Sequence, residues 1–308
     1  MSTKKVVFLM GSGHNGSTLL GLILGSHSRI HSLGELVVLR KAADTPFPDV
    51  PKLCSTCAGK CEFWNSKVDL AVLQKYFSQK DLFSALRASA NHRGRSIYEY
   101  FFEWSDRDIL VDFSKPPKWI ELQLRQLDCW KKVRPILIYL ARDGRAVVNS
   151  YLRKYPDRTI VEETVRWKRN VEDMEKLYRK CGLEKKLVLS YEELATRPAD
   201  VGRRLCEVLE VEYEPAMLRY WEHEHHIAFG NAGTRSLVLR YQSYLNRGRE
   251  VEFADSFRNI KERHGEHYEE LGLDIKLDLR WKTELTEKQL EVFEFIAGET
   301  NKPLAYDR

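Results

Sequence analysis

The sequence predicts an α/β fold in which helices flank a central parallel sheet of the P-loop nucleotide-binding type. Short apolar runs with the length of buried strands alternate with segments of helical spacing, which is typical of such a sheet. The first run, residues 6–10, is followed at once by a Gly-rich turn over residues 11–16 and by a helix start at Ser17. This strand–loop–helix order favours phosphate binding, because glycines let backbone N–H groups close on an anion at the positive end of the helix dipole.

The Gly-rich loop resembles a Walker A motif in all but one position. Gly11, Gly16 and Thr18 have the required spacing, but Ser17 stands where that motif has its lysine. The phosphate cradle is therefore expected without the group that contacts the β- and γ-phosphates of a triphosphate. A Gly-rich turn that binds no ligand is the alternative.

The remaining elements follow in order along the chain. Residues 31–36 are expected to follow the first helix through a short loop, and residues 46–65 are expected to be loop-like. Further strands are expected at residues 109–111, 135–140 and 187–189, and helices at residues 116–127, 146–150 and 198–209. In a parallel sheet of this kind, ligands bind at the carboxyl ends of the strands.

Length and composition describe a single globular domain. The 308 residues predict one domain over 1–308, with a cap or insertion around 45–105 and a mostly helical part around 240–308. The net charge of +5 suits anionic ligands but is too small for a nucleic-acid-binding protein. No segment reaches the roughly 20 apolar residues of a membrane span, and the first strand leaves no room for a signal peptide. We therefore expect a cytoplasmic protein that has no membrane span and does not bind nucleic acid.

A second anion site is expected at the end of the strand over residues 135–140. Arg142 offers a guanidinium fork for phosphate oxygens, and Ser150 adds a hydroxyl two helical turns further on. A salt-bridged turn of Arg142 with Asp143 is the alternative. A phosphate loop without lysine, together with a separate Arg/Ser site, indicates a nucleotide that carries phosphates at two distant points.

Two clusters raise the question of a metal ion. Cys54, Cys57 and Cys61 are close enough to bind zinc, but a structural site needs four ligands and the neighbouring sequence offers no partner. A local structural loop is favoured, while zinc and a disulfide remain open. In the run over residues 223–226, adjacent histidines do not converge from one face, so a loop edge without metal is expected.

At these residues the chain resembles the sulfotransferases that use 3′-phosphoadenosine 5′-phosphosulfate (PAPS), and the resemblance covers nearly all of it. Residues 13–20 resemble the 5′-phosphosulfate loop, and residues 140–150 the 3′-phosphate motif. Residues 191–194 resemble the tyrosine-acid motif, residues 229–235 the late loop over the nucleotide, and residues 111–116 the Ser-Lys strand end of bacterial members. The cysteine cluster before Phe63 and Trp64 also occurs in bacterial members. The donor-binding residues that the resemblance implies are Gly13, His14, Asn15, Gly16, Ser17, Thr18, Arg142, Ser150, Tyr191, Gly230, Asn231 and Arg235.

The resemblance implies sulfuryl transfer from PAPS to an acceptor hydroxyl, with adenosine 3′,5′-bisphosphate (PAP) as the product and no metal. In-line displacement needs positive groups on the moving sulfonate and a base for the acceptor. Lys115 at a strand end suits the leaving oxygen, and Glu35 matches the base of tyrosylprotein-type members. A solvated lysine and a glutamate at a helix N-terminus are the alternatives.

The chain departs from the family at two positions. His14 stands where the family has Arg or Lys, so it serves either the phosphosulfate or a proton transfer; Gly144 replaces a proline. The alternative functions are a P-loop nucleotide kinase, which Ser17 opposes, and a non-catalytic nucleotide-binding protein. The acceptor stays open among carbohydrates, small alcohols or phenols, and tyrosyl hydroxyls.

Overall fold

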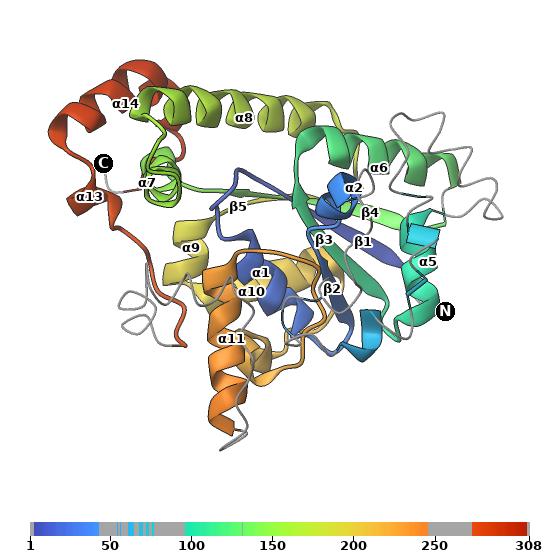
Figure 1. The fold of residues 1–308 in the computed structure, drawn as a ribbon. Coiled ribbons are helices and arrows are strands. Elements are labelled where there is room, and N and C mark those ends of the chain that lie inside the picture. The colour runs from blue at the N-terminus through green and yellow to red at the C-terminus, as the bar shows by residue number, and fades with distance from the viewer. Residues whose placement is uncertain are drawn as a thin grey trace.

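A central sheet organises the fold (Figure 1). The computed structural model of the chain describes residues 3–42, 54, 56, 61–64, 68–69, 72–73, 76, 96–130, 132–245 and 273–306. Within these residues, neighbouring strands of the sheet are all parallel, in the order β2-β3-β1-β4-β5. The strands are β1 (Lys5–Met10), β2 (Ile30–Gly34), β3 (Ile109–Lys115), β4 (Arg134–Ala141) and β5 (Lys186–Ser190). The predicted fold class is confirmed.

The central position of β1 determines where a ligand can bind. β1 pairs with β3 on one side and with β4 on the other, so the strand order reverses around it. Such a reversal opens a crevice outside the carboxyl ends of the strands. The Gly-rich loop leaves β1 at this crevice.

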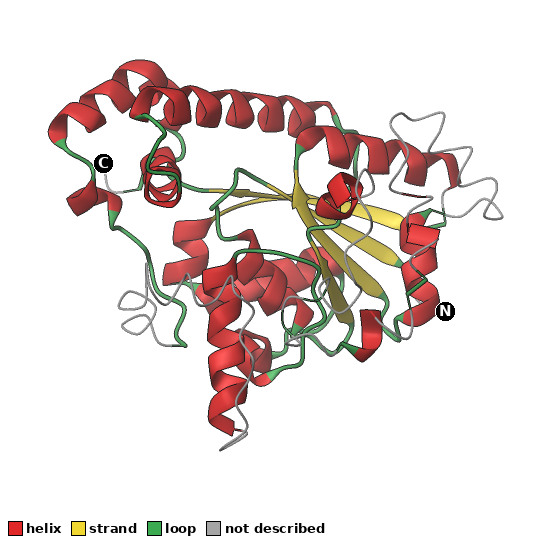
Figure 2. Cartoon of the chain, viewed as in Figure 1, coloured by secondary structure: helices red, strands yellow, loops and turns green. Residues whose placement is uncertain are grey.

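Helices cover both faces of the sheet, as Figures 1 and 2 show. On one face, Val7 and Leu9 of β1 share an apolar core with α1 (Ser17–Gly25), α9 (Tyr191–Thr196) and α10 (Pro198–Leu209), while α11 (Ala232–Leu245) packs on α1. On the other face, Val6 and Phe8 share a core with α5 (Ile97–Trp104), α6 (Pro117–Trp130) and α8 (Ile160–Lys180). Both side-chain sets of β1 are therefore buried, which explains its continuous apolar sequence.

The last described helix, α14 (Glu287–Asn301), packs with α7 (Gly144–Lys154) and α8 beside the end of β4. Val147 of α7, Trp167 of α8 and Phe293 of α14 form a separate apolar cluster. Asp143 caps α7, since its carboxylate accepts a hydrogen bond from the backbone N–H of Arg145. The shorter elements are α2 (Val37–Ala42), α13 (Trp281–Glu284) and the 3₁₀ helices η3 (Pro215–Leu218) and η4 (Tyr220–Glu222).

One strand of the sheet was not predicted from the sequence. Residues 31–36 were expected only to follow the first helix through a short loop, and Ile30–Gly34 form strand β2. His31 and Ser32 interrupt its apolar pattern, and β2 pairs in the sheet only through β3. The other strands begin within one residue of their predicted starts, β3 extends four residues past its predicted end, and the predicted helix over residues 198–209 is α10.

Two further expectations concern the cap around residues 45–105 and a membrane span. Much of the expected cap around 45–105 lies outside the described residues, as does Cys57. Among the helices that the structure does describe, none combines the length and apolar character that crossing a bilayer requires.

Candidate functional site

The Gly-rich loop connects the buried end of β1 to the N-terminus of α1. Gly16 precedes the helix with φ of +91°, and a Cβ atom there would lie 2.6 Å from the ring of Tyr191. Glycine is therefore required at this position on both conformational and steric grounds. The first backbone N–H groups of α1 have no partner within the helix and point out of its N-terminus, as an anion site needs.

The side chain of Asn15 holds this loop from the side of the sheet. Its amide nitrogen donates to the carbonyl of Leu140 at 2.8 Å, and its amide oxygen accepts from the backbone N–H of Ser17 at 3.1 Å. Asn15 is fully buried. Its contacts are those of a residue that shapes the loop rather than of one that faces a ligand.

Arg142, just beyond β4, connects the loop to two other parts of the molecule. Its guanidinium donates to the carbonyl of His14 at 2.7 Å and approaches the carboxylate of Asp278 at 3.3 Å. It also lies 4.1 Å from the centre of the Tyr191 ring, within the range of a cation–π contact. The predicted residues Arg142 and Tyr191 therefore lie side by side next to the phosphate loop.

Ser150 lies on α7 and lines a cavity that the phosphate loop and Arg142 also line. Its hydroxyl donates to the carbonyl of Ala146 at 2.8 Å, which leaves the oxygen able to accept a hydrogen bond. Lys154 lines the cavity one turn further along α7. Lys154 was not predicted, although its four-residue spacing from Ser150 was a usable signal.

The late loop closes against the phosphate loop. The backbone N–H of Asn231 donates to the hydroxyl of Thr18 at 2.9 Å, and Gly230 adopts a φ of +117°. The side-chain oxygen of Asn231 accepts from the backbone N–H of Thr234 at 3.1 Å in the first turn of α11. Residues more than two hundred positions apart in the sequence thus form one wall.

Glu35 and Lys115 form an ion pair at the neighbouring strand ends. The ammonium group of Lys115 lies 2.7 Å from the carboxylate of Glu35, and 14% and 20% of the two side chains are exposed. Lys115 ends β3 and Glu35 follows β2, so the parallel pairing of these strands brings them together. The backbone N–H of Glu35 donates to the carbonyl of Ala228 at 2.7 Å, which ties it to the chain before the late loop.

Strained backbone conformations gather around this site. His14, Lys115 and Phe229 have φ of +61°, +72° and +61°, a region that non-glycine residues seldom occupy. Such conformations cost about 1–3 kcal/mol each and persist where the surrounding structure enforces them. Their position next to the phosphate loop, the ion pair and the late loop indicates a functional site.

His14 is neutral in this environment. Burial is the largest influence, and the positive charges of Lys154, Arg142 and Lys115 act in the same direction, so the pKa of His14 falls to about 3. A bound phosphate or sulfonate would oppose these cations and favour the protonated ring. We therefore expect the pKa of His14 to rise when an anion occupies the site.

These groups surround one cavity of about 490 Å³, a size typical of small-molecule sites. The predicted residues in its wall are Gly13, His14, Gly16, Ser17, Thr18, Glu35, Lys115, Arg142, Ser150, Tyr191, Gly230 and Asn231. Asn15 and Arg235 do not line it. Arg235 is buried, which lowers its pKa to about 10 although Glu35 favours its charged form.

Several lining residues were not predicted from the sequence. Tyr151 and Tyr155 join Lys154 on α7, and the segment after the undescribed residues contributes Asp274, Ile275, Lys276, Asp278 and Arg280. Asp278 lies 136 positions from Arg142, and no local pattern marks a contact of that separation. The fold and the position of this cavity define an α/β protein of the P-loop type.

Comparison with known proteins identifies the family. Residues 7–215 match the model of the sulfotransferase family, and because this is more than half of the chain, the protein belongs to that family. No curated protein matches the sequence.

Two solved structures are similar in fold. The sulfotransferase domain from the curacin biosynthetic pathway has a TM-score of 0.52 at 16% identity, over 97% of this chain and 98% of that one. The sulfotransferase domain from the Synechococcus PCC 7002 olefin synthase has a TM-score of 0.55 at 16% identity, over 100% of this chain and 96% of that one. At this identity the likeness is one of fold.

Proposed function

We propose that this protein transfers a sulfuryl group from PAPS to an acceptor hydroxyl, with PAP as the second product. The observation that carries the proposal is the shared cavity: the phosphate loop, Arg142 with Ser150, and the Glu35–Lys115 ion pair all line it. Membership of the sulfotransferase family supports the same reaction.

The donor would occupy the cavity along its phosphate-binding groups. The 5′-phosphosulfate fits the N–H groups at the start of α1, while Arg142, Ser150 and Lys154 supply charge and a hydroxyl for the 3′-phosphate. Tyr191 is the candidate for contact with adenine. Positive charge from separate elements suits a ligand with two separated phosphates.

The transfer step requires a base and a stabiliser of the leaving group. The acceptor oxygen attacks sulfur, its proton passes to the carboxylate of Glu35, and the bond from sulfur to the bridging oxygen breaks as PAP leaves. Lys115 carries three N–H donors, so it can hold Glu35 and also contact the leaving oxygen. The pair therefore orients the base and neutralises the charge that develops on PAP.

The alternatives receive less support. Neither the family match nor the similar folds favour a nucleotide kinase, and Ser17 occupies the position of the kinase-type lysine. A non-catalytic nucleotide-binding protein has no use for a partly buried carboxylate–ammonium pair in the wall of the cavity. The proposal leaves the acceptor open among carbohydrates, small alcohols or phenols, and tyrosyl hydroxyls.

Turnover of labelled PAPS against a panel of these three acceptor classes tests the proposal. Thermal-shift titrations with PAP and with ATP form the companion measurement. We expect label transfer to at least one acceptor and a larger shift with PAP. Stabilisation by ATP alone, with no consumption of PAPS, would refute the proposed donor.

A further inference from the structure

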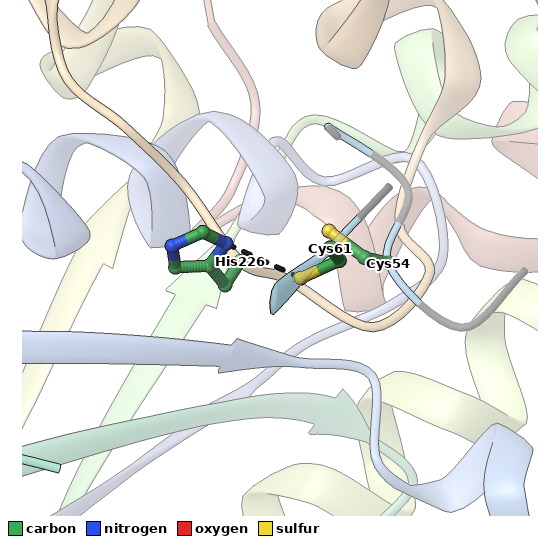
Figure 3. A group of neighbouring side chains, drawn as sticks. All are labelled: Cys54, Cys61 and His226. Carbon is green, nitrogen blue, oxygen red and sulfur yellow. Dashed lines mark hydrogen bonds between the residues drawn. The ribbon is translucent and has the colours of Figure 1, made fainter. Parts of the chain in front are cut away.

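We propose that Cys54, Cys61 and His226 supply three of the four ligands of a structural zinc ion outside the nucleotide cavity. Figure 3 shows the three side chains converging, with the ring of His226 directed toward the sulfur of Cys61. Their ligand atoms all lie within 4.8 Å of one another, and the Cys61 sulfur lies 3.3 Å from Nδ1 of His226. Ligands of a tetrahedral zinc lie about 2.0–2.3 Å from the ion and hence somewhat under about 4 Å from each other, so a small contraction suffices.

The identity and charge of the ligands favour zinc. Two thiolates and an imidazole are soft donors of the kind that zinc prefers and that magnesium and calcium do not. Binding releases the two thiol protons, so the metal's two positive charges are balanced by two thiolates. This neutrality matters because Cys54 and Cys61 are buried in the apolar core.

The surrounding hydrogen bonds already hold the ligands in a metal-binding arrangement. Nε2 of His226 lies 3.2 Å from the carboxylate of Glu224, which can accept its N–H, and Nδ1 faces the Cys61 sulfur. The backbone N–H of Trp64 donates to the Cys61 sulfur at 3.5 Å. The indole N–H of Trp64 donates to the carbonyl of His226 at 2.9 Å and fixes the two segments together.

These contacts explain why the sequence alone did not reveal the site. The cysteines lie 165 positions or more before His226, and it is the fold that joins them. Cys57, the remaining member of the sequence cluster, lies outside the described residues. The histidine run was expected to be a metal-free loop edge, and among its members His226 is the one brought to the cysteines.

The position of the cluster gives the ion a structural role. Cys54 and Gly34 both form bridges with Ala228, two residues after His226. Ala228 in turn accepts the backbone N–H of Glu35, and Gly230 lines the cavity. Zinc would therefore fasten the segment before the late loop beside the proposed base without touching the donor.

Metal analysis of tag-free protein from zinc-supplemented cells tests the site. We expect about one zinc per chain in the wild type and in Cys181→Ser, a matched control at a cysteine outside the cluster. Cys61→Ser and His226→Ala should lose the zinc, and its removal from the wild type should lower the melting temperature, which zinc but not magnesium restores.

Cobalt substitution keeps the test valid if the variants fold poorly. Wild-type protein loaded with Co²⁺ should show thiolate-to-cobalt charge transfer and tetrahedral d–d bands. His226→Cys, which keeps a ligand, should retain the ion with a stronger charge-transfer band. A folded wild type with neither stoichiometric zinc nor a cobalt–thiolate band, or a Cys54–Cys61 disulfide found by mass spectrometry, would overturn the proposal.

Discussion

The Glu35–Lys115 ion pair concentrates the proposed chemistry in two side chains. We expect Glu35→Gln to leave PAP affinity nearly unchanged and to cut turnover by about 10²–10⁴-fold, because the amide keeps the size of the side chain but accepts no proton. Initial rates and PAP titrations on the same preparation measure both effects.

A matched control separates the loss of the base from the loss of a salt bridge. Glu121→Gln breaks an exposed pair with Arg125 on α6 and should leave turnover unchanged. In Glu35→Gln the fall of turnover at acidic pH should also disappear. Turnover like that of the wild type in well-folded Glu35→Gln would remove Glu35 from the mechanism, with His14 and His31 the next bases to test.

The lowered pKa of His14 predicts that the free energy of unfolding depends on pH. Its pKa is about 3 in the folded chain against an ordinary 6.5, so the unfolded state takes up the proton first as the pH falls. The stability linked to the neutral ring is present above pH 6.5 and is lost progressively toward pH 3. Urea unfolding between about pH 7 and about pH 5 should show this loss.

The control for His14 is an asparagine, which tolerates the left-handed backbone of this position. His14→Asn should flatten the pH dependence, while the similar contribution of buried His225, whose pKa falls to about 4, is common to both proteins and cancels. Saturating PAP should stabilise the wild type more at the lower pH, since bound phosphates favour the protonated ring. Equal slopes in the two proteins would contradict this account of His14.

At the scale of elements, α7 and the turn before it present the proposed 3′-phosphate site. Arg142→Ala and Ser150→Ala should each weaken PAP binding, because a charge-assisted hydrogen bond is worth about 1.5–3 kcal/mol, or roughly tenfold to a hundredfold in affinity. Calorimetric titration with PAP and with adenosine 5′-monophosphate, which lacks the 3′-phosphate, measures the selectivity.

A neighbouring arginine on α7 provides the control for that helix. Arg153 pairs with Glu284 and does not line the cavity, so Arg153→Ala should leave the affinity for both nucleotides unchanged. If Arg142→Ala weakened both nucleotides equally, the residue would instead hold the phosphate loop through its contact with the His14 carbonyl.

The segment over residues 273–280 places a carboxylate beside the same arginine. Burial raises the pKa of Asp278, but the hydrogen bond from Arg280 and the charge of Arg142 outweigh it and bring the pKa well below its usual range. Asp278 therefore stays ionised next to the proposed 3′-phosphate. We expect Asp278→Asn to tighten PAP binding several-fold in fluorescence or calorimetric titrations, because a like charge is removed.

Asp274→Asn is the control for the loss of a negative charge from the cavity, because it makes the same substitution elsewhere in the cavity wall. This variant should alter PAP affinity less, since Asp278 is the carboxylate that pairs with Arg142. Weaker binding in Asp278→Asn would mean that the carboxylate positions Arg142 and Arg280 rather than opposing the phosphate.

Across the whole molecule, the sequence best predicts the elements that depend on residues adjacent in the chain. The apolar run before a Gly-rich turn predicts β1, the loop and α1, because strand, glycines and helix start are adjacent in the chain. Parallel topology then implies that the strand ends meet, and the structure brings Glu35 and Lys115 within 2.7 Å. These predictions need only short-range pattern and one general rule of sheets.

What the sequence misses depends on distant contacts. β2 is a half-polar edge strand that is defined by its pairing with β3. Asp278 and His226 reach their partners across more than 130 positions, and Asn15 turns to the sheet because the Leu140 carbonyl of β4 is there to receive it. Tertiary packing decides all of these, and periodicity carries no information about it.

Gly34 joins the sheet to the segment that precedes the late loop through a bridge with Ala228, so its substitution tests the coupling of fold and site. It has φ of +98°, and a Cβ atom there would lie 2.1 Å from the carbonyl oxygen of Ala228. That carbonyl accepts the N–H of Glu35, while the N–H of Ala228 donates to the carbonyl of Leu33 at 2.8 Å. Gly34→Ala must therefore push Ala228 away from the proposed base.

We expect Gly34→Ala to lower the free energy of unfolding by at least about 1–2 kcal/mol from its left-handed backbone alone, and to reduce turnover more than PAP affinity. The phosphate loop lies on β1 and should keep its geometry, whereas Glu35 loses its backbone anchor. Urea unfolding, PAP titration and initial rates on one preparation distinguish these effects.

Gly182→Ala is the matched control, since a Cβ atom there meets nothing within 4 Å. The free energy of unfolding of this variant should change by less than about 1 kcal/mol. Full turnover in Gly34→Ala would show that the position of Glu35 does not depend on Ala228.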